Sequence, residues 1–198
     1  MKSFHEFIER IKEYREISEV DEYARRLFSM NGFDGCITIL GVLIGFYIQN
    51  IDEPMLIFKT GIAVAIAMAI SGLWGAYSAE RSERIKDLKE LERVTISDLN
   101  NTKIGSALRF ATIVVAIVNA VAPFITAFLT LIPFLFAKSL DIKTCYYISF
   151  IILFSTLFLL GIFLGRVSKE NLLIAAIKMI IAGIMCVLII TFAERFIG

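Results

Sequence analysis

One carboxylate stands inside an apolar stretch, where an ionised group is costly. Asp34 lies within SMNGFDGCITILGVLIG, residues 29–45, which otherwise has the composition of a starting membrane helix. An ionisable side chain in hydrocarbon costs about 2.5–3.5 kcal/mol on insertion scales, so it normally faces a protein interior or a water-filled path. A carboxylate that can bind either a proton or a divalent cation is the minimal part of a proton-coupled ion pathway.

Polar residues accompany this carboxylate at helical spacing. Steps of three and four residues place Asn31, Asp34 and Thr38 on one face together with small residues. A later apolar stretch repeats the pattern with Asn119 and Thr126, and it also holds two prolines that each free a backbone carbonyl. Such faces suit a pathway lined by oxygen atoms, and they also suit ordinary close packing of membrane helices.

A third stripe runs along the apolar stretch that lies between these two in the chain. Its small members are Gly61, Ala65, Gly72 and Ala76. The same face continues to Glu80 and Glu83, for which a solvated charged helix end is the alternative.

Asp34 would lie about 9–10 Å from the start of its helix at 1.5 Å per residue. It could therefore pair with Arg25 or Arg26, or cap a neighbouring backbone, instead of joining the other stripes in one polar core.

The composition excludes several classes of protein. Hydrophobic residues make up 58% of the 198 residues, seventeen are phenylalanine and the mean hydropathy is +0.77, which exceeds what a soluble domain of this size could bury. The net charge of +1, without a separate basic stripe, gives no argument for nucleic acid. Three cysteines without CxxC spacing predict neither a disulfide framework nor a zinc site. The only histidine, His5, lies in the expected surface helix, and the sequence shows no nucleophile and base pair, so an enzyme is not expected.

The chain divides into a charged start and five apolar segments of membrane-spanning length. The segments are 27–49, 56–79, 108–137, 145–164 and 172–196. We therefore expect an all-α integral membrane protein with a five-helix transmembrane domain over 27–198. An amphipathic cytoplasmic helix is expected over 1–26, although a solvated charged helix leading into the first span is the alternative. Between the second and third spans, a short cytoplasmic helical connection is expected at about 80–107.

Basic residues are distributed unequally between the two sides that these spans imply. Sixteen of the twenty Lys and Arg residues fall in the N-terminal helix, the connection at 80–109 and the region 166–178. The other four are Lys59, Lys138, Lys143 and Arg195. By the positive-inside rule, we expect a multi-pass protein of the cell membrane with its N-terminus in the cytoplasm and its C-terminus outside.

Four segments resemble the vacuolar iron transporter family. FDGCITILGVLIG looks like its first helix, where an Asp-Gly pair opens a small-residue helix, and SGLWGAYSAERSE looks like the end of its second. APFITAFLTLIPF resembles its proline-containing third helix, and GRVSKEN followed by AIKMIIAGIMCVLII resembles its last connection and fifth helix. The likeness covers roughly residues 25–198 in order. The chain resembles a prokaryotic-like member of this family with a shortened cytoplasmic metal-binding region.

The resemblance implies a homodimeric antiporter in the lipid bilayer that exports ferrous iron, and often manganese, from the cytoplasm against protons. The pathway would lie at the dimer interface, with Asp34 as the transport aspartate and Glu83 at the cytoplasmic mouth. Hard oxygen ligands suit both metals as cargo, and no tightly bound cofactor is expected. The metal ligands expected are Asp34, Glu80, Glu83 and Glu90; the other pathway residues expected are Asn31, Thr38, Ser71, Asn119 and Thr126.

Several family ligands have no counterpart in this sequence. Further carboxylates of the family's first helix align with Leu27 and Tyr23, a glutamate of its second aligns with Ala63, and a methionine ligand aligns with Ser71. Met68 is expected to pack, as methionines usually do. The cytoplasmic connection has only about 25 residues, so Glu80, Glu83, Glu90 and Glu92 would form a reduced capture patch in a dimer. Two alternatives stay open: a non-transporting scaffold or assembly protein with the same fold, and a transporter of another solute.

Overall fold

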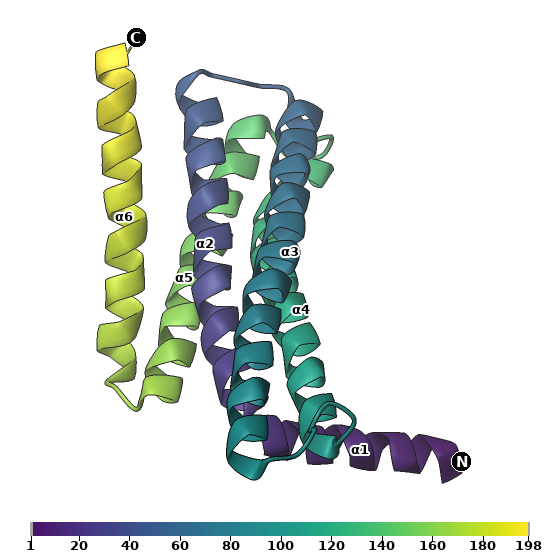
Figure 1. Ribbon diagram of the computed structural model, residues 1–198. Helices are drawn as coiled ribbons and strands as arrows, with labels where there is room; N and C mark the ends of the chain where they lie inside the picture. The colour runs from purple at the N-terminus through teal and green to yellow at the C-terminus, as the bar shows by residue number, and fades with distance from the viewer. Residues whose placement is uncertain (1, 198) are drawn as a thin grey trace.

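The chain is helical throughout the part that the structure describes. The computed structural model describes residues 2–197, with the side chains of residues 8–196, and no strand occurs among them. The elements are α1 (Lys2–Ser18), α2 (Val20–Ile48), α3 (Pro54–Thr95), α4 (Lys103–Leu131), the 3-10 helix η1 (Ile132–Phe136), α5 (Ile142–Ser168) and α6 (Leu172–Ile197). The all-helical prediction is confirmed for these residues. Helices α2 to α6 run up and down one bundle, and α1 lies across one end of it (Figure 1).

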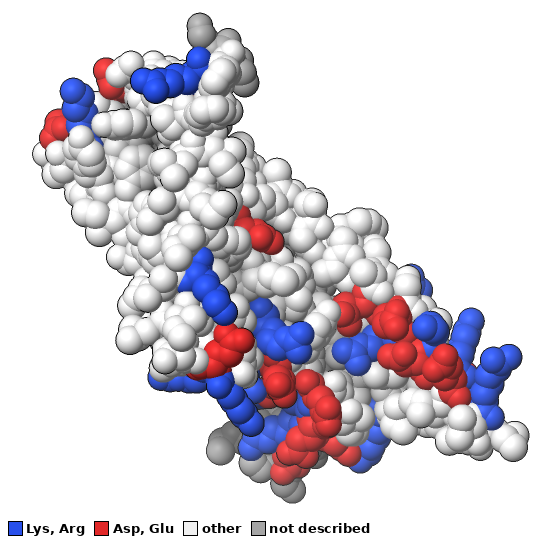
Figure 2. All heavy atoms as spheres, turned by 90° about the vertical axis from the view of Figure 1, so that its left-hand side faces the viewer, with Lys and Arg blue, Asp and Glu red and all other residues white. Residues whose placement is uncertain are grey.

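Five of these helices are long and apolar enough to cross a membrane. They are α2, α3, α4 with η1, α5 and α6, which correspond in order to the five predicted apolar segments. Charged side chains gather mostly at the two ends of the molecule, with a largely uncharged band between them (Figure 2). A bilayer demands this distribution, because charges are stable in water and at headgroups but costly in hydrocarbon. A multi-pass membrane protein follows from these features.

The first helix break differs in position from the boundary expected at residue 26. Helix α1 ends at Ser18, Glu19 takes a left-handed backbone conformation with φ 49°, and α2 begins at Val20. The Arg15 guanidinium and the Asp21 carboxylate hold the corner from either side, with Nε 2.8 Å from Oδ1. From Val20 the chain continues as one helix to Ile48. The charged residues 20–26 therefore belong to the same helix as Asp34.

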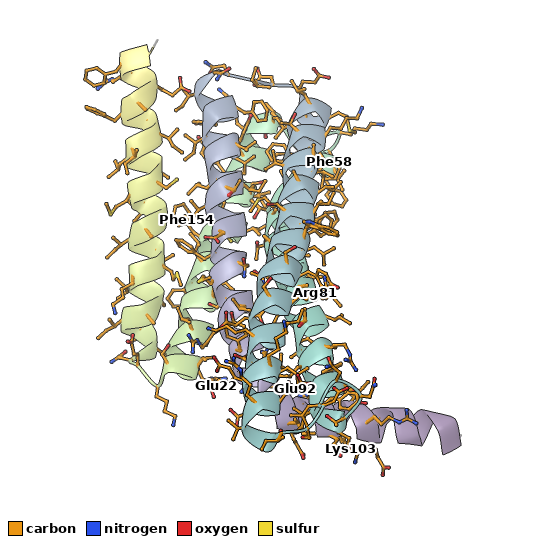
Figure 3. The ribbon with its side chains drawn as sticks, in the orientation of Figure 1. Glu22, Phe58, Arg81, Glu92, Lys103 and Phe154 are labelled. Atoms are coloured by element: carbon orange, nitrogen blue, oxygen red, sulfur yellow. The ribbon has the colours of Figure 1, made fainter. Side chains whose placement is uncertain are left out.

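Helix α1 is fixed against the start of α4. The ring of Tyr14 lies 6.0 Å from the ring of Phe110, and Glu13 forms an ion pair with Lys103. Figure 3 shows Glu22, Glu92 and Lys103 at the end of the bundle where α1 lies. That end also holds the α3–α4 and α5–α6 connections (Figure 1). The regions that carry sixteen of the twenty basic residues therefore meet at one end of the molecule.

Helix α4 packs closely against both α2 and α3, at positions that only small residues permit. A Cβ atom on Gly35 of α2 would stand 2.6 Å from the Cα of Pro123, and one on Gly72 of α3 would stand 2.6 Å from the carbonyl oxygen of Asn119. Neither position has room for a side chain. Small residues allow this close backbone approach, which is the usual means of packing helices in lipid. The small-residue stripe predicted for the second span faces α4 in this way.

Aromatic side chains close the opposite end of the bundle. Tyr146 lies 5.3 Å from Tyr47 and 5.2 Å from Phe134, ring centre to ring centre, and its hydroxyl donates to the carbonyl of Ile51 at 3.0 Å. Asp141 caps the start of helix α5 nearby, and its carboxylate accepts from the backbone N–H of Thr144. The Thr144 hydroxyl and backbone N–H lower the pKa of Asp141 because both stabilise its ionised form. The ends of the spans are thus fixed by local contacts on both sides.

Candidate functional site

An open hollow of about 430 Å³ lies where α2, α3 and α4 meet. Its lining residues are Asn31, Asp34, Ala67, Met68, Ser71, Gly72, Asn119 and Pro123. Four of the nine site residues expected from the sequence are among them: Asn31, Asp34, Ser71 and Asn119. The three predicted stripes therefore meet at one place, although not every member of each stripe reaches it.

The hollow exists because α2 and α3 both pack against α4 and leave a gap between themselves. Helices α2 and α3 each pack extensively on α4 but contact each other far less. Gly35 and Gly72, the two close-approach glycines, draw them onto the α4 backbone at Pro123 and Asn119. The side chains of Asp34 and Ser71, each next to one of these glycines, then border the gap in front of α4.

Asp34 is exposed in the single chain, and no described residue supplies a compensating charge. The carboxylate makes no ion pair or hydrogen bond among the described residues, so pairing with Arg25 or Arg26 and capping of a nearby backbone do not occur there. Because α2 begins at Val20, Asp34 lies fourteen residues inside the helix, about 21 Å from its start. An ionised group at this depth cannot face lipid cheaply.

The other polar groups of the hollow present mainly oxygen atoms. The Asn31 amide donates to the carbonyl of Leu27 at 2.8 Å, and the Asn119 amide donates to the carbonyl of Val115 at 2.9 Å. Each amide nitrogen is therefore used within its own helix, which leaves the amide oxygen as the free acceptor among the described contacts. With the Asp34 carboxylate and the exposed hydroxyl of Ser71, the hollow offers the hard oxygen donors that divalent cations prefer.

Two expected pathway residues are elsewhere. Thr126 is 3% exposed, and its hydroxyl oxygen lies 3.1 Å from the carbonyl oxygens of Gly32 and of Pro123. It therefore joins α2 to α4 behind the hollow. Thr38 is half-buried on α2 and does not line the hollow. A helix face is wide, so residues at its edges contact neighbouring helices and do not reach the hollow.

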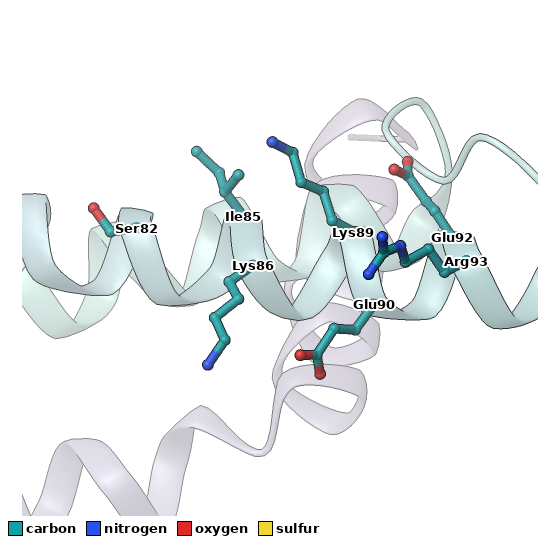
Figure 4. Close-up of a pocket in the computed structure, with 7 residues that line it drawn as sticks. All are labelled: Ser82, Ile85, Lys86, Lys89, Glu90, Glu92 and Arg93. Carbon is teal, nitrogen blue, oxygen red and sulfur yellow. The ribbon is translucent and has the colours of Figure 1, made fainter.

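The glutamates of α3 stand apart from Asp34. Glu80 pairs with Arg84 at 3.3 Å and also interacts with the Tyr23 hydroxyl, while Glu83 is exposed. Glu90 lies farther along α3, where it projects to the same side as Lys86 (Figure 4). No group of three His, Cys, Asp or Glu side chains suited to a metal occurs within the described residues of one chain. The expected ligands are therefore not assembled by a single copy.

Two residues that line the hollow were not predicted from the sequence as pathway residues. Met68 was expected to pack, yet its side chain borders the hollow one turn before Ser71. Ala67 lies beside it, and the exposed residues Ala63, Ala67, Ser71 and Gly75 follow one another at intervals of four. That interval is a sequence signal for a helix face open to close packing, and it could have located this side of α3.

Comparison with known proteins gives one archaeal relative. The uncharacterized protein MJ0645 of Methanocaldococcus jannaschii is 32% identical to the chain over 163 residues, which cover 80% of this chain and 82% of the relative. The chain belongs to the same family as this protein. No protein-family profile matches the sequence, and no solved structure matches it significantly. The name of this relative states no activity, so the proposed function depends on the residues of the site.

Proposed function

We propose that the protein is a membrane transporter that exports divalent transition metal, ferrous iron or manganese, from the cytoplasm in exchange for protons. The observation that carries the proposal is the uncompensated Asp34 carboxylate in the oxygen-lined hollow between α2, α3 and α4. This proposal retains the expected likeness to the vacuolar iron transporter family and the expected orientation, with the end that carries α1 in the cytoplasm.

The chemistry of the hollow supports a cation as its occupant. A carboxylate, two amide oxygens and a hydroxyl offer negative or partly negative atoms, and no cationic side chain lines the hollow within the described residues. A bound cation would offset the cost of the ionised Asp34, and so would a proton. Cation and proton would therefore compete for one group, which is the requirement of an antiporter.

The donor set also supports ferrous iron in preference to a purely hard ion, while manganese would be bound mainly by the oxygen donors. Met68 borders the hollow next to the oxygen donors and supplies a thioether, a soft ligand. The resemblance implied that a methionine ligand had been lost at Ser71. Met68, three residues earlier on the same helix, provides the same kind of atom at the site.

A second copy of the chain would complete the site. Among the described residues, one copy supplies a single carboxylate to the hollow, whereas a metal site needs several ligands. The hollow is open on the side where Ala67 and Ser71 of α3 are exposed. A homodimer formed across this side would bring two Asp34 carboxylates together and shield both from lipid.

The test is metal flux in proteoliposomes. Ferrous iron and manganese uptake would be measured under an imposed proton gradient for the wild-type chain, Asp34→Asn and Asp52→Asn. Asp52 lies exposed in the α2–α3 connection, so its replacement is the matched control for loss of one carboxylate. We expect gradient-dependent flux that falls to the protein-free background in Asp34→Asn and stays within about twofold of wild type in Asp52→Asn, a surface change.

A scaffold or assembly protein is the second candidate, and it is favoured because the described residues of one chain contain no three-ligand group. Absence of flux for both metals, with a folded dimer demonstrated, would give this candidate the lead. Flux of a non-metal solute through the same chain, lost in Asp34→Asn, would instead favour a transporter of another solute.

A further inference from the structure

Three arginines border a second pocket, between the end of α3 and the start of α4. Its volume is about 220 Å³, and Arg81, Arg84 and Arg109 line it. No acidic side chain lines it within the described residues. Figure 3 shows Arg81 where α3 and α4 run side by side. The pocket is separate from the hollow at Asp34, because Arg81 is ten residues beyond Ser71 on α3, about 15 Å along the helix axis.

The arginine side chains are positioned but not neutralised as a group. Arg109 donates to the carbonyl of Asn100 at 2.9 Å and to the hydroxyl of Ser106 at 3.2 Å, so its guanidinium is held in place without a carboxylate. Arg84 uses its Nε atom for Glu80, and its two terminal nitrogens make no hydrogen bond among the described residues. Arg81 makes none there at all.

Two carboxylates lie near the pocket and are engaged elsewhere. Glu92 accepts from the Leu99 backbone and from the Asn100 amide, and Asp98 accepts from the Asn100 backbone and amide. The backbone N–H and the amide of Asn100 lower the pKa of Asp98, because they stabilise its ionised form. These two acids fix the turn before α4. Gly105, in the first turn of α4, lines the pocket, so the positive end of that helix dipole adds to the field of the arginines.

The pocket lies where lipid headgroups would be. Trp74 and Tyr77 of α3 are 71% and 37% exposed, and their rings lie 6.3 Å apart. Exposed tryptophan and tyrosine on a spanning helix mark the membrane–water boundary. Arg81 follows Tyr77 by four residues, which is about 6 Å farther along the axis and within the interfacial layer.

We propose that this arginine pocket binds a phosphate group, supplied by the headgroup of an anionic phospholipid. Guanidinium groups match phosphate oxygens in paired hydrogen bonds, and basic pockets between helices on the cytoplasmic side are suited to anionic headgroups. The apolar side chains of Ile85, Leu88 and Leu108 share the lining and can contact the glycerol and the upper acyl carbons. Phosphate binding in this pocket does not depend on the transport of metal.

The test is lipid binding by the purified full-length chain in detergent micelles, measured by native mass spectrometry. Phosphatidylglycerol would be titrated against phosphatidylcholine for the wild type, Arg81→Gln, Arg81→Lys and Lys89→Gln. Arg81 has no described partner to lose, so its variants are expected to fold. Lys89 is an exposed cation on the same helix but lines a different hollow, so its replacement controls for loss of one charge.

We expect the wild type to bind phosphatidylglycerol at least about tenfold more tightly than phosphatidylcholine, and Arg81→Gln to lose about tenfold, the size of one charge-assisted hydrogen bond. Arg81→Lys keeps the charge without the paired geometry and should lose less. Lys89→Gln should match the wild type. An equal loss in Arg81→Gln and Lys89→Gln would overturn the proposal, because it would mean only general charge attraction.

A second arm separates the two sources of phosphate. Inorganic phosphate in the millimolar range should displace phosphatidylglycerol from the wild type if the phosphate group is the part recognised. Phosphate binding that requires Arg81, with no preference for phosphatidylglycerol, would retain the phosphate site and assign it a soluble ligand. Absence of binding by both probes to the wild type would refute it.

Discussion

Two buried serines differ in how their hydroxyls are satisfied. Ser29 on α2 is fully buried, and its Oγ donates to the carbonyl of Leu160 on α5 at 3.2 Å. Ser149 on α5 is equally buried, and its Oγ has no hydrogen-bond partner among the described residues. Burying a hydroxyl without a partner costs free energy, whereas a made hydrogen bond returns about 0.5–1.5 kcal/mol net.

The two alanine variants should therefore differ in their effect on stability. We expect Ser29→Ala to lower the free energy of unfolding by about 1 kcal/mol, and Ser149→Ala to leave it unchanged or raise it by up to about 1 kcal/mol. The measurement is denaturation of the purified chain in mixed micelles, followed by circular dichroism. Each variant serves as the control for the other. A larger loss in Ser149→Ala than in Ser29→Ala would show that the Ser149 hydroxyl has a partner.

Residue types located part of the candidate site, but they did not identify all the residues that line it. Asp34 could be recognised from sequence because a carboxylate in an apolar stretch is costly wherever the helix packs. Thr126 could not be separated from Asn119, because both lie on one face of α4 and only the packing of α2 decides which is covered. Met68 was missed for the same reason: a methionine side chain fits a core and an open hollow equally well.

At the scale of helices, one end is unusual. Helix α3 ends at Thr95, and its C-cap residue, Ile96, has φ 52° in the left-handed region. A β-branched side chain is disfavoured there, where glycine is the common residue. Ile96 is 93% exposed, so it has almost no packing to lose.

Replacement of this residue by glycine should stabilise the protein. Ile96→Gly is expected to raise the free energy of unfolding by about 1 kcal/mol, since it removes the left-handed strain. Val94→Gly is the matched control: Val94 is 83% exposed and lies within the helix. There glycine should destabilise by roughly 0.5–1 kcal/mol. Melting temperatures in one detergent would compare them, and a fall for Ile96→Gly as large as that for Val94→Gly would contradict the argument.

The sequence predicted helix positions where the determining features lie within the helix itself. Length and apolar composition predicted five spans, because a helix that crosses lipid must satisfy its own backbone and show an apolar surface along about 20 residues. The break at Glu19 was not predictable, because no glycine or proline marks it and the Arg15–Asp21 pair forms only once the corner exists. The pairing of helices depends on which glycines meet which backbone, and a stripe alone does not specify this.

For the whole molecule, the exposed face of α3 has a consequence for assembly. Ala63, Ala67, Ser71 and Gly75 present small side chains outward at intervals of four, next to the Asp34 hollow. A second helix can approach closely along such a face. The proposed homodimer would use this face, because the same contact would remove both Asp34 carboxylates from lipid.

Cysteine cross-linking in membranes tests that arrangement directly. A Cβ atom on Gly75 meets no atom within 4 Å in the single chain, so Gly75→Cys is tolerated without repacking. Leu188→Cys on α6, where Leu188 is 63% exposed, is the matched control on another face. Both would be made with Cys186→Ala, since Cys36 and Cys145 are buried and Cys186 is the one half-buried thiol of the three.

We expect mild oxidation to convert most of the Gly75→Cys chain to a covalent dimer and little of the Leu188→Cys chain, because a disulfide requires Cα atoms within about 7 Å of each other. Dilution of the protein with excess lipid should leave the Gly75→Cys yield unchanged, whereas cross-linking by random collision would fall. Stronger cross-linking at Leu188 than at Gly75 would place the interface on α6. It would then leave Asp34 without a partner carboxylate, so the metal site would have to be assembled from the donors of one chain.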